Sequence, residues 1–129
     1  MPLAADEMPT VACLCAAWCT TCQAYAATFA QVARTHPGAR FVWIDIEDHS
    51  DALGDEALDI ENFPTLMLLR GDTPLFFGTV LPHAATLSRL VHAAEDGSLA
   101  STDHTAARHQ AEVLARPVAE LARTLPGVR

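Results

Sequence analysis

The chain has 129 residues, of which 8 are basic and 16 acidic, and half of its residues are hydrophobic. This length and composition fit one domain with a buried core and exclude wholesale disorder. The net charge of −8 argues against binding to nucleic acid or to an anionic membrane, because both call for a basic face.

No run approaches the ~20 apolar residues of a membrane span. Residues 1–8 lack the basic start of a signal peptide. A cytoplasmic protein is therefore expected, or a periplasmic one if a leader was removed.

The first part of the chain predicts a strand, a helix and a second strand. Thr10–Ala16 is a short apolar run of small and β-compatible residues, which is typical of a buried strand. From Thr20 the apolar residues recur at helical spacing, and the helix is expected to end at His36-Pro37-Gly38. The residues expected on its buried face are Cys22, Tyr25, Ala26, Phe29 and Ala33. Arg40–Ile46, with its β-branched and aromatic side chains, predicts the second strand.

The next part predicts a hairpin and a helix. Asp51–Ile60 is expected to form a short acidic helix or a loop. Thr65–Leu69 predicts a buried strand, Gly71–Pro74 a turn, and Leu75–Val80 the strand that pairs with it. A further helix is predicted from Pro82 to about Glu95. Its core-facing residues are expected to be Leu87, Leu90 and Val91.

This order of elements predicts an α/β fold. A strand, a crossover helix and a second strand form a right-handed parallel unit. The hairpin adds antiparallel strands, so the expected sheet is mixed and four-stranded, with helices on both faces.

Residues 97–129 are expected to form a helical extension to a domain of residues 1–96. Leu114, Val118, Leu121 and Leu125 recur at helical spacing, and Pro117 could kink the helix. One interpretation is a helix that packs on the domain or hangs loosely from it. The alternative is a contact with a partner or a second copy through residues 102–125.

The four cysteines, Cys13, Cys15, Cys19 and Cys22, are crowded together, which indicates a site and not a set of disulfide staples. Cys19 is expected at the start of the helix, where unpaired N–H groups favour its thiolate form. Cys22 lies one turn further on, so the two can cycle between dithiol and disulfide. Cys19 would be the attacking thiolate, Cys22 the resolving thiol, and Trp18 an apolar platform beside them.

Trp18-Cys19-Thr20-Thr21-Cys22 resembles the WCxxC active site of the thioredoxin superfamily, and Phe63-Pro64-Thr65 resembles its cis-proline loop. The resemblance implies a thioredoxin-like fold, disulfide exchange with protein substrates, and a reductase or another dithiol as electron donor, without a cofactor or metal. It also implies that Phe63, Pro64 and Thr65 present backbone to the substrate. It covers about residues 10 to 95. Because the superfamily's first strand and helix do not fit before Thr10, a trimmed N-terminus and an extra C-terminal helix are expected.

The chain departs from the superfamily at positions that usually matter for proton transfer. A buried Asp is common where this chain has Cys13, and its usual Lys partner corresponds to Trp43. Both charges are absent together, which avoids leaving one of them buried and unpaired. Cys15 replaces a common Trp, and Thr20-Thr21 matches neither the reducing nor the oxidising dipeptides. Reduction of substrates is the expected direction, mainly on the grounds of compartment.

Other interpretations remain open. Cys13 and Cys15 lie two apart on one strand face, where they could be small buried hydrophobes or auxiliary thiols that relay a disulfide. The clustered thiols could bind zinc or copper. The domain could instead be a binding or chaperone module with little turnover. The acidic segment 45–61 could be a solvated face, or could select basic partners and slow attack by Cys19.

Overall fold

The computed structural model describes residues 8–54, 60, 64–80, 83–97 and 105–128. The strands are β1 (Thr10–Cys15), β2 (Arg40–Asp45), β3 (Thr65–Arg70) and β4 (Thr73–Thr79). The helices are α1 (Thr20–Thr35), α2 (Ser50–Leu53), α4 (Ala84–Asp96) and α5 (Thr105–Thr124). The predicted order of strands and helices is confirmed, and most of the bounds agree within one or two residues.

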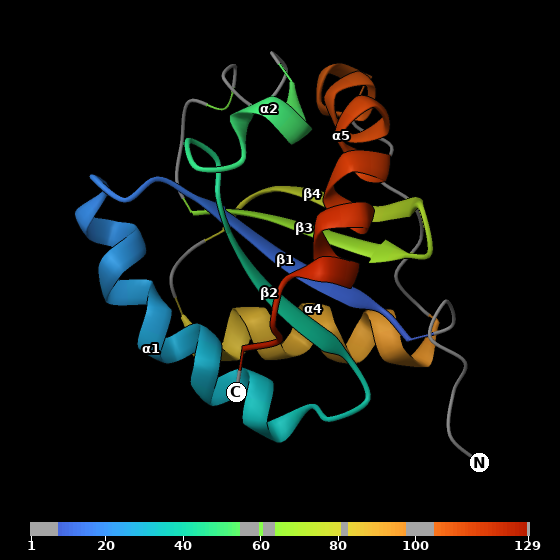
Figure 1. Ribbon diagram of the computed structural model, residues 1–129. Helices are drawn as coiled ribbons and strands as arrows, with labels where there is room; N and C mark the ends of the chain where they lie inside the picture. The colour runs from blue at the N-terminus through green and yellow to red at the C-terminus, as the bar shows by residue number, and fades with distance from the viewer. Residues whose placement is uncertain (1–7, 55–59, 61–63, 81–82, 98–104, 129) are drawn as a thin grey trace.

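The four strands form one mixed sheet in the order β2-β1-β3-β4 (Figure 1). The strands β1 and β2 run parallel, because α1 carries the chain back between them. The pairs β1–β3 and β3–β4 are antiparallel. The expected mixed, four-stranded sheet flanked by helices is therefore confirmed.

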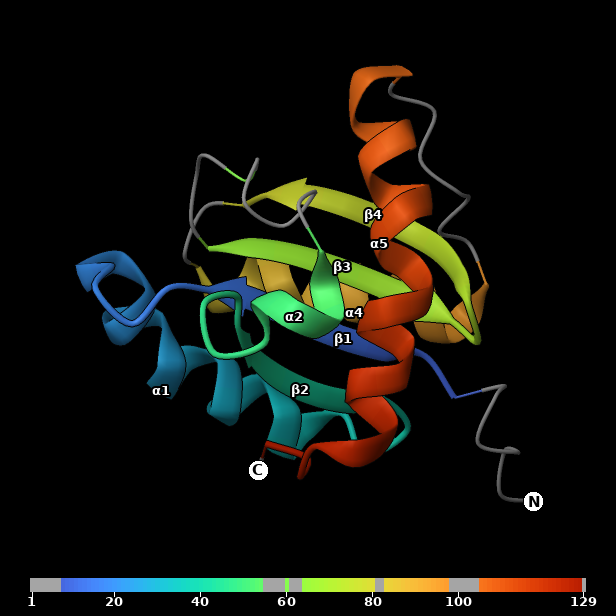
Figure 2. The same ribbon diagram turned by 45° about the horizontal axis from the view of Figure 1, so that its top comes forward.

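Each face of the sheet has its own hydrophobic core. The face under α1 and α4 takes the odd-numbered residues of β1, and the face under α2 and α5 takes Ala12 and Leu14. This division follows from the alternation of side chains along a strand. Figure 2 shows α5 crossing the sheet on the side opposite to α4. We refer below to the α1 face and the α5 face.

The buried side of α1 differs from the expected one at two positions. Cys22, Tyr25, Phe29 and Ala33 are buried as predicted, but Ala26 is exposed. Val32 is buried in its place, because it lies three residues after Phe29 and so falls on the same side of the helix. In α4, Leu87 and Val91 are fully buried, and Leu90 packs against the same core.

The β3–β4 hairpin is tighter than the predicted turn. Only Gly71 and Asp72 lie between the strands, and Gly71 has the positive φ of 60° that such a turn needs. Thr73 and Pro74 belong to β4 instead of the turn, and Pro74 pairs with Leu69. A proline fits there because β4 is an edge strand and an irregularity in the register interrupts the pairing at this point.

The helix α5 packs along the sheet and continues through Pro117. Leu114 and Val118 are fully buried, and Leu121 and Leu125 pack beside them, as the spacing predicted. Among the described side chains of α5, from residue 110 on, the other buried residues are Ala111, Ala115, Ala119 and Ala122. Their small side chains let the helix approach the sheet closely. The division of the chain at residue 97 and a partner contact through residues 102–125 stay predictions.

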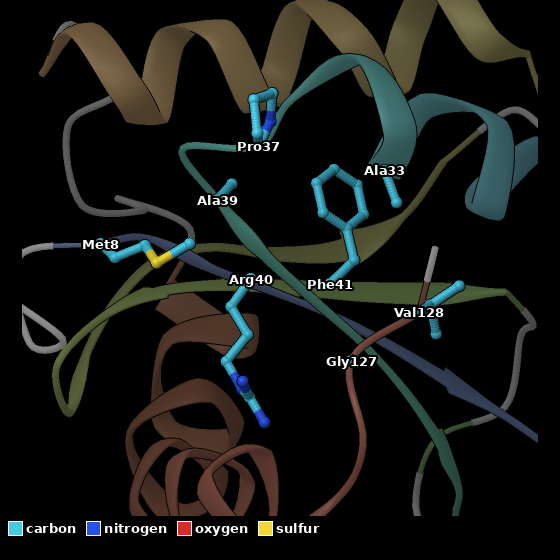
Figure 3. A pocket seen from close by; sticks show the side chains of 8 residues that line it. All are labelled: Met8, Ala33, Pro37, Ala39, Arg40, Phe41, Gly127 and Val128. Atoms are coloured by element: carbon cyan, nitrogen blue, oxygen red, sulfur yellow. The ribbon is translucent and has the colours of Figure 1, made fainter. Parts of the chain in front are cut away.

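Hydrogen bonds connect the C-terminal segment to β2, through the side chain of Arg40 and through the backbone of Phe41. Arg40 donates from Nε to the carbonyl oxygen of Ala122 at 2.6 Å and from Nη2 to that of Leu125 at 2.7 Å. The backbone N–H of Val128 donates to Phe41 O at 2.8 Å. Figure 3 shows the Phe41 ring and the Arg40 side chain pointing to opposite faces of β2. Both residues line a cavity of about 50 Å³, which lies near the C-terminal end of α1, far from Cys19.

A polar link joins the end of α1 to α4. His36 donates from Nδ1 to Glu95 Oε1 at 2.8 Å, and its Nε2 lies 2.9 Å from Ser88 Oγ. The three side chains are all at least partly buried. This link, together with the shared apolar core, holds α1 and α4 side by side on one face of the sheet.

Candidate active site

A short loop between β1 and α1 presents Cys19 at the first position before the helix. Cys19 has extended backbone angles (φ −83°, ψ 115°), and its carbonyl oxygen accepts a hydrogen bond from Gln23 N–H at 3.1 Å. The loop is closed by the Cys19 N–H, which donates to Ala16 O at 3.0 Å. Gln23 Nε2 also donates to Ala17 O at 2.7 Å. These hydrogen bonds fix the loop around Cys19 and place Cys19 at the N-terminus of α1, which is the positive end of the helix dipole.

Exposure differs sharply among the residues of the Trp18–Cys22 motif. The side chain of Trp18 is 66% exposed, and Cys19 is partly exposed. Cys22 is only 1% exposed and belongs to the core of the α1 face. Cys19 packs against that same core. A partner protein can therefore reach Trp18 and Cys19 from outside, whereas Cys22 is covered.

The disulfide in the structure joins Cys15 to Cys22, and Cys19 and Cys13 are free thiols. From the sequence, Cys22 is expected to pair with Cys19 instead. The difference arises because Cys15 ends β1 with its side chain on the α1 face, where Cys22 also points. Their Cα atoms are 6.0 Å apart, a separation that a disulfide spans readily. The Cys19–Cys22 pair stays a prediction.

Cys13 lies deepest in the cysteine cluster. It is fully buried, and its Sγ is 3.4 Å from that of Cys15. Burial raises the pKa of the Cys13 thiol, so it stays protonated over the physiological range. Tyr25 lies on the same face, and burial raises the pKa of its hydroxyl, with Cys13 as a second cause. The hydroxyl has no hydrogen-bond partner among the described residues.

The two residues expected to stand in place of a buried charge pair are neighbours in the sheet, and the replacement itself stays a prediction. Cys13 on β1 and Trp43 on β2 are paired neighbours. The Trp43 ring packs edge-on against Phe29, with ring centroids 5.7 Å apart. Where the superfamily often has an Asp and a Lys, this chain has a thiol and an aromatic ring. The only ionisable group of this pair is thus a thiol that burial keeps protonated.

Two other residues predicted to bind the substrate, Pro64 and Thr65, lie where β3 begins. This is the end of the sheet at which the cysteines lie. Thr65 is the register partner of Leu14, the residue before Cys15. Pro64 and Thr65 are both buried. Phe63 lies outside the described residues. The structure therefore brings Pro64 and Thr65 to the end of β1 that leads into the Cys19 loop.

The acidic segment begins beside the cysteines. Asp45 is the register partner of Cys15, and its carboxylate accepts hydrogen bonds from the N–H groups of Glu47 and Asp48 at 2.9 and 3.1 Å. Of the segment 51–60, predicted to be a short acidic helix or a loop, the first residues belong to the helix α2, which runs from Ser50 to Leu53. Residues 55–59 and 61–63 lie outside the described part of the chain. The segment's effect on Cys19 stays a prediction.

From the sequence, Cys15 is expected to be either a small buried hydrophobe or an auxiliary thiol, and in the structure it is bonded to Cys22. Two patterns together point to this pairing. The period of two places Cys15 on the strand face that α1 covers, and the helical period turns Cys22 inward. Either pattern alone leaves the partner of Cys22 open.

Within the described residues, no group of three or more His, Cys, Asp or Glu side chains is arranged to hold a metal ion. All helices in that part of the chain lack the length or the apolar run needed to cross a bilayer.

The fold and the cysteine loop define the class of protein. A mixed sheet whose first described strand leads through a cysteine loop into α1, with helices on both faces, is a thioredoxin-like fold. The thioredoxin family model matches residues 3–92, so the chain belongs to the thioredoxin family. No curated protein sequence matches it.

Solved thioredoxin structures share this fold. The germline-specific thioredoxin Deadhead of Drosophila melanogaster is 22% identical with a TM-score of 0.57, covering 67% of this chain and 81% of its own. Spinach chloroplast thioredoxin f is 23% identical with a TM-score of 0.59, covering 68% and 71%. Fasciola hepatica thioredoxin is 16% identical with a TM-score of 0.59, covering 68% and 82%. Family membership and a disulfide-capable cysteine pair support thiol–disulfide exchange as the general chemistry.

Proposed function

We propose that this protein reduces disulfides in protein substrates through Cys19 and Cys22. The Cys19 thiolate attacks one sulfur of the substrate disulfide, so a mixed disulfide forms and one substrate thiolate leaves. Cys22 then attacks Cys19 Sγ, which releases the second substrate thiol and leaves a Cys19–Cys22 disulfide. The two electrons that reduce the substrate come from the two cysteine thiols.

One observation carries this assignment. Cys19 is a free and partly exposed thiol at the start of a 16-residue helix, while Cys22 is covered one turn below it. An attacking thiol has to be reachable by a large partner, whereas a resolving thiol needs only to reach the first. The exposures of the two side chains follow this division of work.

A substrate surface beside Cys19 is part of the proposal. The exposed Trp18 ring offers an apolar contact next to the thiol. Pro64 and the first residue of β3, Thr65, lie at the same end of the sheet, and Phe63 is assigned here from the family resemblance alone. An extended peptide would lie between these two segments.

The reducing direction and a cytoplasmic location complete the proposal. A reductase or another dithiol protein would return the disulfide to the dithiol, because the exchange itself needs only thiols and no organic cofactor. In a compartment poised by glutathione, the dithiol form is the expected resting state.

The test is insulin reduction together with trapping. The wild type is expected to reduce insulin with dithiothreitol as donor. Cys22→Ser is expected to accumulate mixed disulfides through Cys19, and the matched variant Cys19→Ser is expected to accumulate none. Absence of both reduction and trapping would favour a binding module with little turnover. Stoichiometric zinc or copper without a reversible disulfide would favour a thiolate metal site.

A further inference from the structure

We infer that Cys15 is a third redox cysteine, which takes the disulfide from the exposed pair into the core. The oxidised protein then has two isomers, an open one with a Cys19–Cys22 bond and a closed one with the Cys15–Cys22 bond of this structure. The inference rests on the proposed function, because that function supplies the open isomer.

Cys22 is the sulfur common to both isomers. Cys15, at 1% exposure, reaches it from the end of β1, and their Cα atoms are 6.0 Å apart. Cys19 lies at the start of α1, three residues before Cys22, which places both on the same side of the helix. Cys19 packs against the same core cluster as the other two. Cys22 is bonded to Cys15, and the helix start places Cys19 on the same side and against the same core, so Cys22 is the residue that both neighbours would share.

The conversion is an ordinary thiol–disulfide exchange. The Cys15 thiolate attacks Cys22 Sγ, so that the Cys15–Cys22 bond forms, the Cys19–Cys22 bond breaks and Cys19 leaves as a thiolate. The proton that Cys15 gives up is matched by the proton that Cys19 takes up. No electrons are gained or lost, so the step needs no outside oxidant or reductant, and it runs in both directions.

Burial gives the two isomers different reactivity. In the closed isomer both sulfurs of the disulfide are 1% exposed, so a partner dithiol has no access to them. The partly exposed thiol is Cys19, which can reopen the bond by attacking Cys22. Reduction of the closed isomer therefore has to pass through Cys19. A protein in this state carries an oxidising pair in its core and a reactive thiol on its surface.

Cys13 is the internal comparison. Its sulfur is as close as 3.4 Å to that of Cys15 and just as buried, yet it is a free thiol in the structure. It lies one strand pleat further from the loop, where the surrounding side chains are apolar. We assign it to the core and not to the exchange.

The first experiment needs no variant. Wild-type protein is oxidised with one molar equivalent of diamide and labelled in native buffer with N-ethylmaleimide. Acid quenching and tandem mass spectrometry of the tryptic peptide that ends at Arg34 then locate the label. The closed isomer predicts label on Cys19 and a Cys15–Cys22 bond. An oxidised protein with only a Cys19–Cys22 bond and no label on Cys19 would overturn the inference.

A second experiment tests the route of reduction. Oxidised protein labelled on Cys19 is expected to lose its disulfide to dithiothreitol at least about tenfold more slowly than unlabelled protein, because the exchanging thiol is blocked. Equal rates would mean that the buried bond is reached directly, which would also overturn the inference.

Matched variants separate Cys15 from its neighbour. Oxidised Cys15→Ala is expected to give only the Cys19–Cys22 bond, without label on Cys19, whereas Cys13→Ala is expected to behave as the wild type. Circular dichroism checks that both variants are folded. If the wild type has the closed isomer but does not reduce insulin, the proposed function fails and Cys15 keeps its bond. If insulin is reduced and only the open isomer forms, the inference on Cys15 fails alone.

Discussion

The two faces of the sheet are covered by different kinds of side chain. The α1 face contains all four cysteines together with the rings of Tyr25, Phe29 and Phe41, whereas the core of the α5 face contains small and aliphatic side chains apart from Met67 and Phe77. Four of its buried residues are alanines of α5. One face therefore contains the cysteines, and the other packs the sheet closely against α5. We expect substitutions on the two faces to separate reactivity from stability.

The largest expected effect is on the α5 face. Leu114→Ala removes a fully buried side chain and is expected to lower the free energy of unfolding by about 2–5 kcal/mol. Urea denaturation measures this loss, and the labelling rate of Cys19 is expected to stay at the wild-type value. The control Val113→Ala changes a side chain that is 41% exposed and should cost less than about 1 kcal/mol. Faster labelling of Cys19 in folded Leu114→Ala would show that the faces are coupled.

Arg40 tests how the last turn of α5 is held to β2. Arg40→Ala removes two hydrogen bonds from a charged group to the carbonyl oxygens of Ala122 and Leu125. We expect a loss of about 2 kcal/mol in the free energy of unfolding. Arg116→Ala is the matched control, because Arg116 forms only an exposed ion pair with Glu120 and should contribute less than about 1 kcal/mol. Equal losses in the two variants would contradict this account.

Cys13 predicts a pH dependence that belongs to the α1 face. The folded protein keeps this thiol protonated because burial raises its pKa, whereas the unfolded chain ionises it near its ordinary value of 9.0. The stabilisation is complete below that value and is lost as the pH rises, since the unfolded state then binds fewer protons. Between pH 8 and pH 10.5 the oxidised wild type should lose about 2 kcal/mol more than Cys13→Ala. Parallel stability curves for the two proteins would contradict the prediction.

The smallest expected effect is at Trp18, which tests substrate contact without disturbing either core. Trp18→Ala is expected to lower kcat/KM for insulin by about fivefold, equivalent to about 1 kcal/mol, because the substrate loses an apolar contact. Its effect on unfolding should stay below about 1 kcal/mol, since the side chain is 66% exposed. Reduction of a small disulfide such as oxidised glutathione serves as the control and should change less than insulin reduction does.

Much of this fold follows from local pattern. The strands from Thr10, Arg40 and Thr65 and the helices α1, α4 and α5 were predicted because hydrophobic period and chain breakers are local properties. Pro74 was misplaced in a turn, because its tolerance in β4 depends on β4 being an edge strand. Ala26 was misplaced in the core, because its neighbours decide which residues of a broad helical face are covered.

The sequence predicts a cysteine site at the start of α1, but it does not predict which cysteines pair. The helix start at Cys19 and the burial of Cys22 follow from spacing. The partner of Cys22 does not follow from the spacing of the cysteines alone, because Cys15 and Cys19 both lie near Cys22 in sequence. The strand period and the helix period have to be combined before they place Cys15 on the face to which Cys22 points. The pairing of Cys13 with Trp43 likewise depends on sheet register, which a single sequence specifies only roughly.

The hydrogen bond from Val128 to Phe41 has a consequence for how molecules of this protein meet one another. A sheet with open edges invites another chain to add a strand, which is a common start of aggregation. Here the chain's own C-terminal segment occupies part of the β2 edge, and Pro74 removes a donor from β4 at the opposite edge. Both edge strands, β2 and β4, are thereby made poor templates for a further strand. We therefore expect the folded protein to resist edge-to-edge association with further copies of itself.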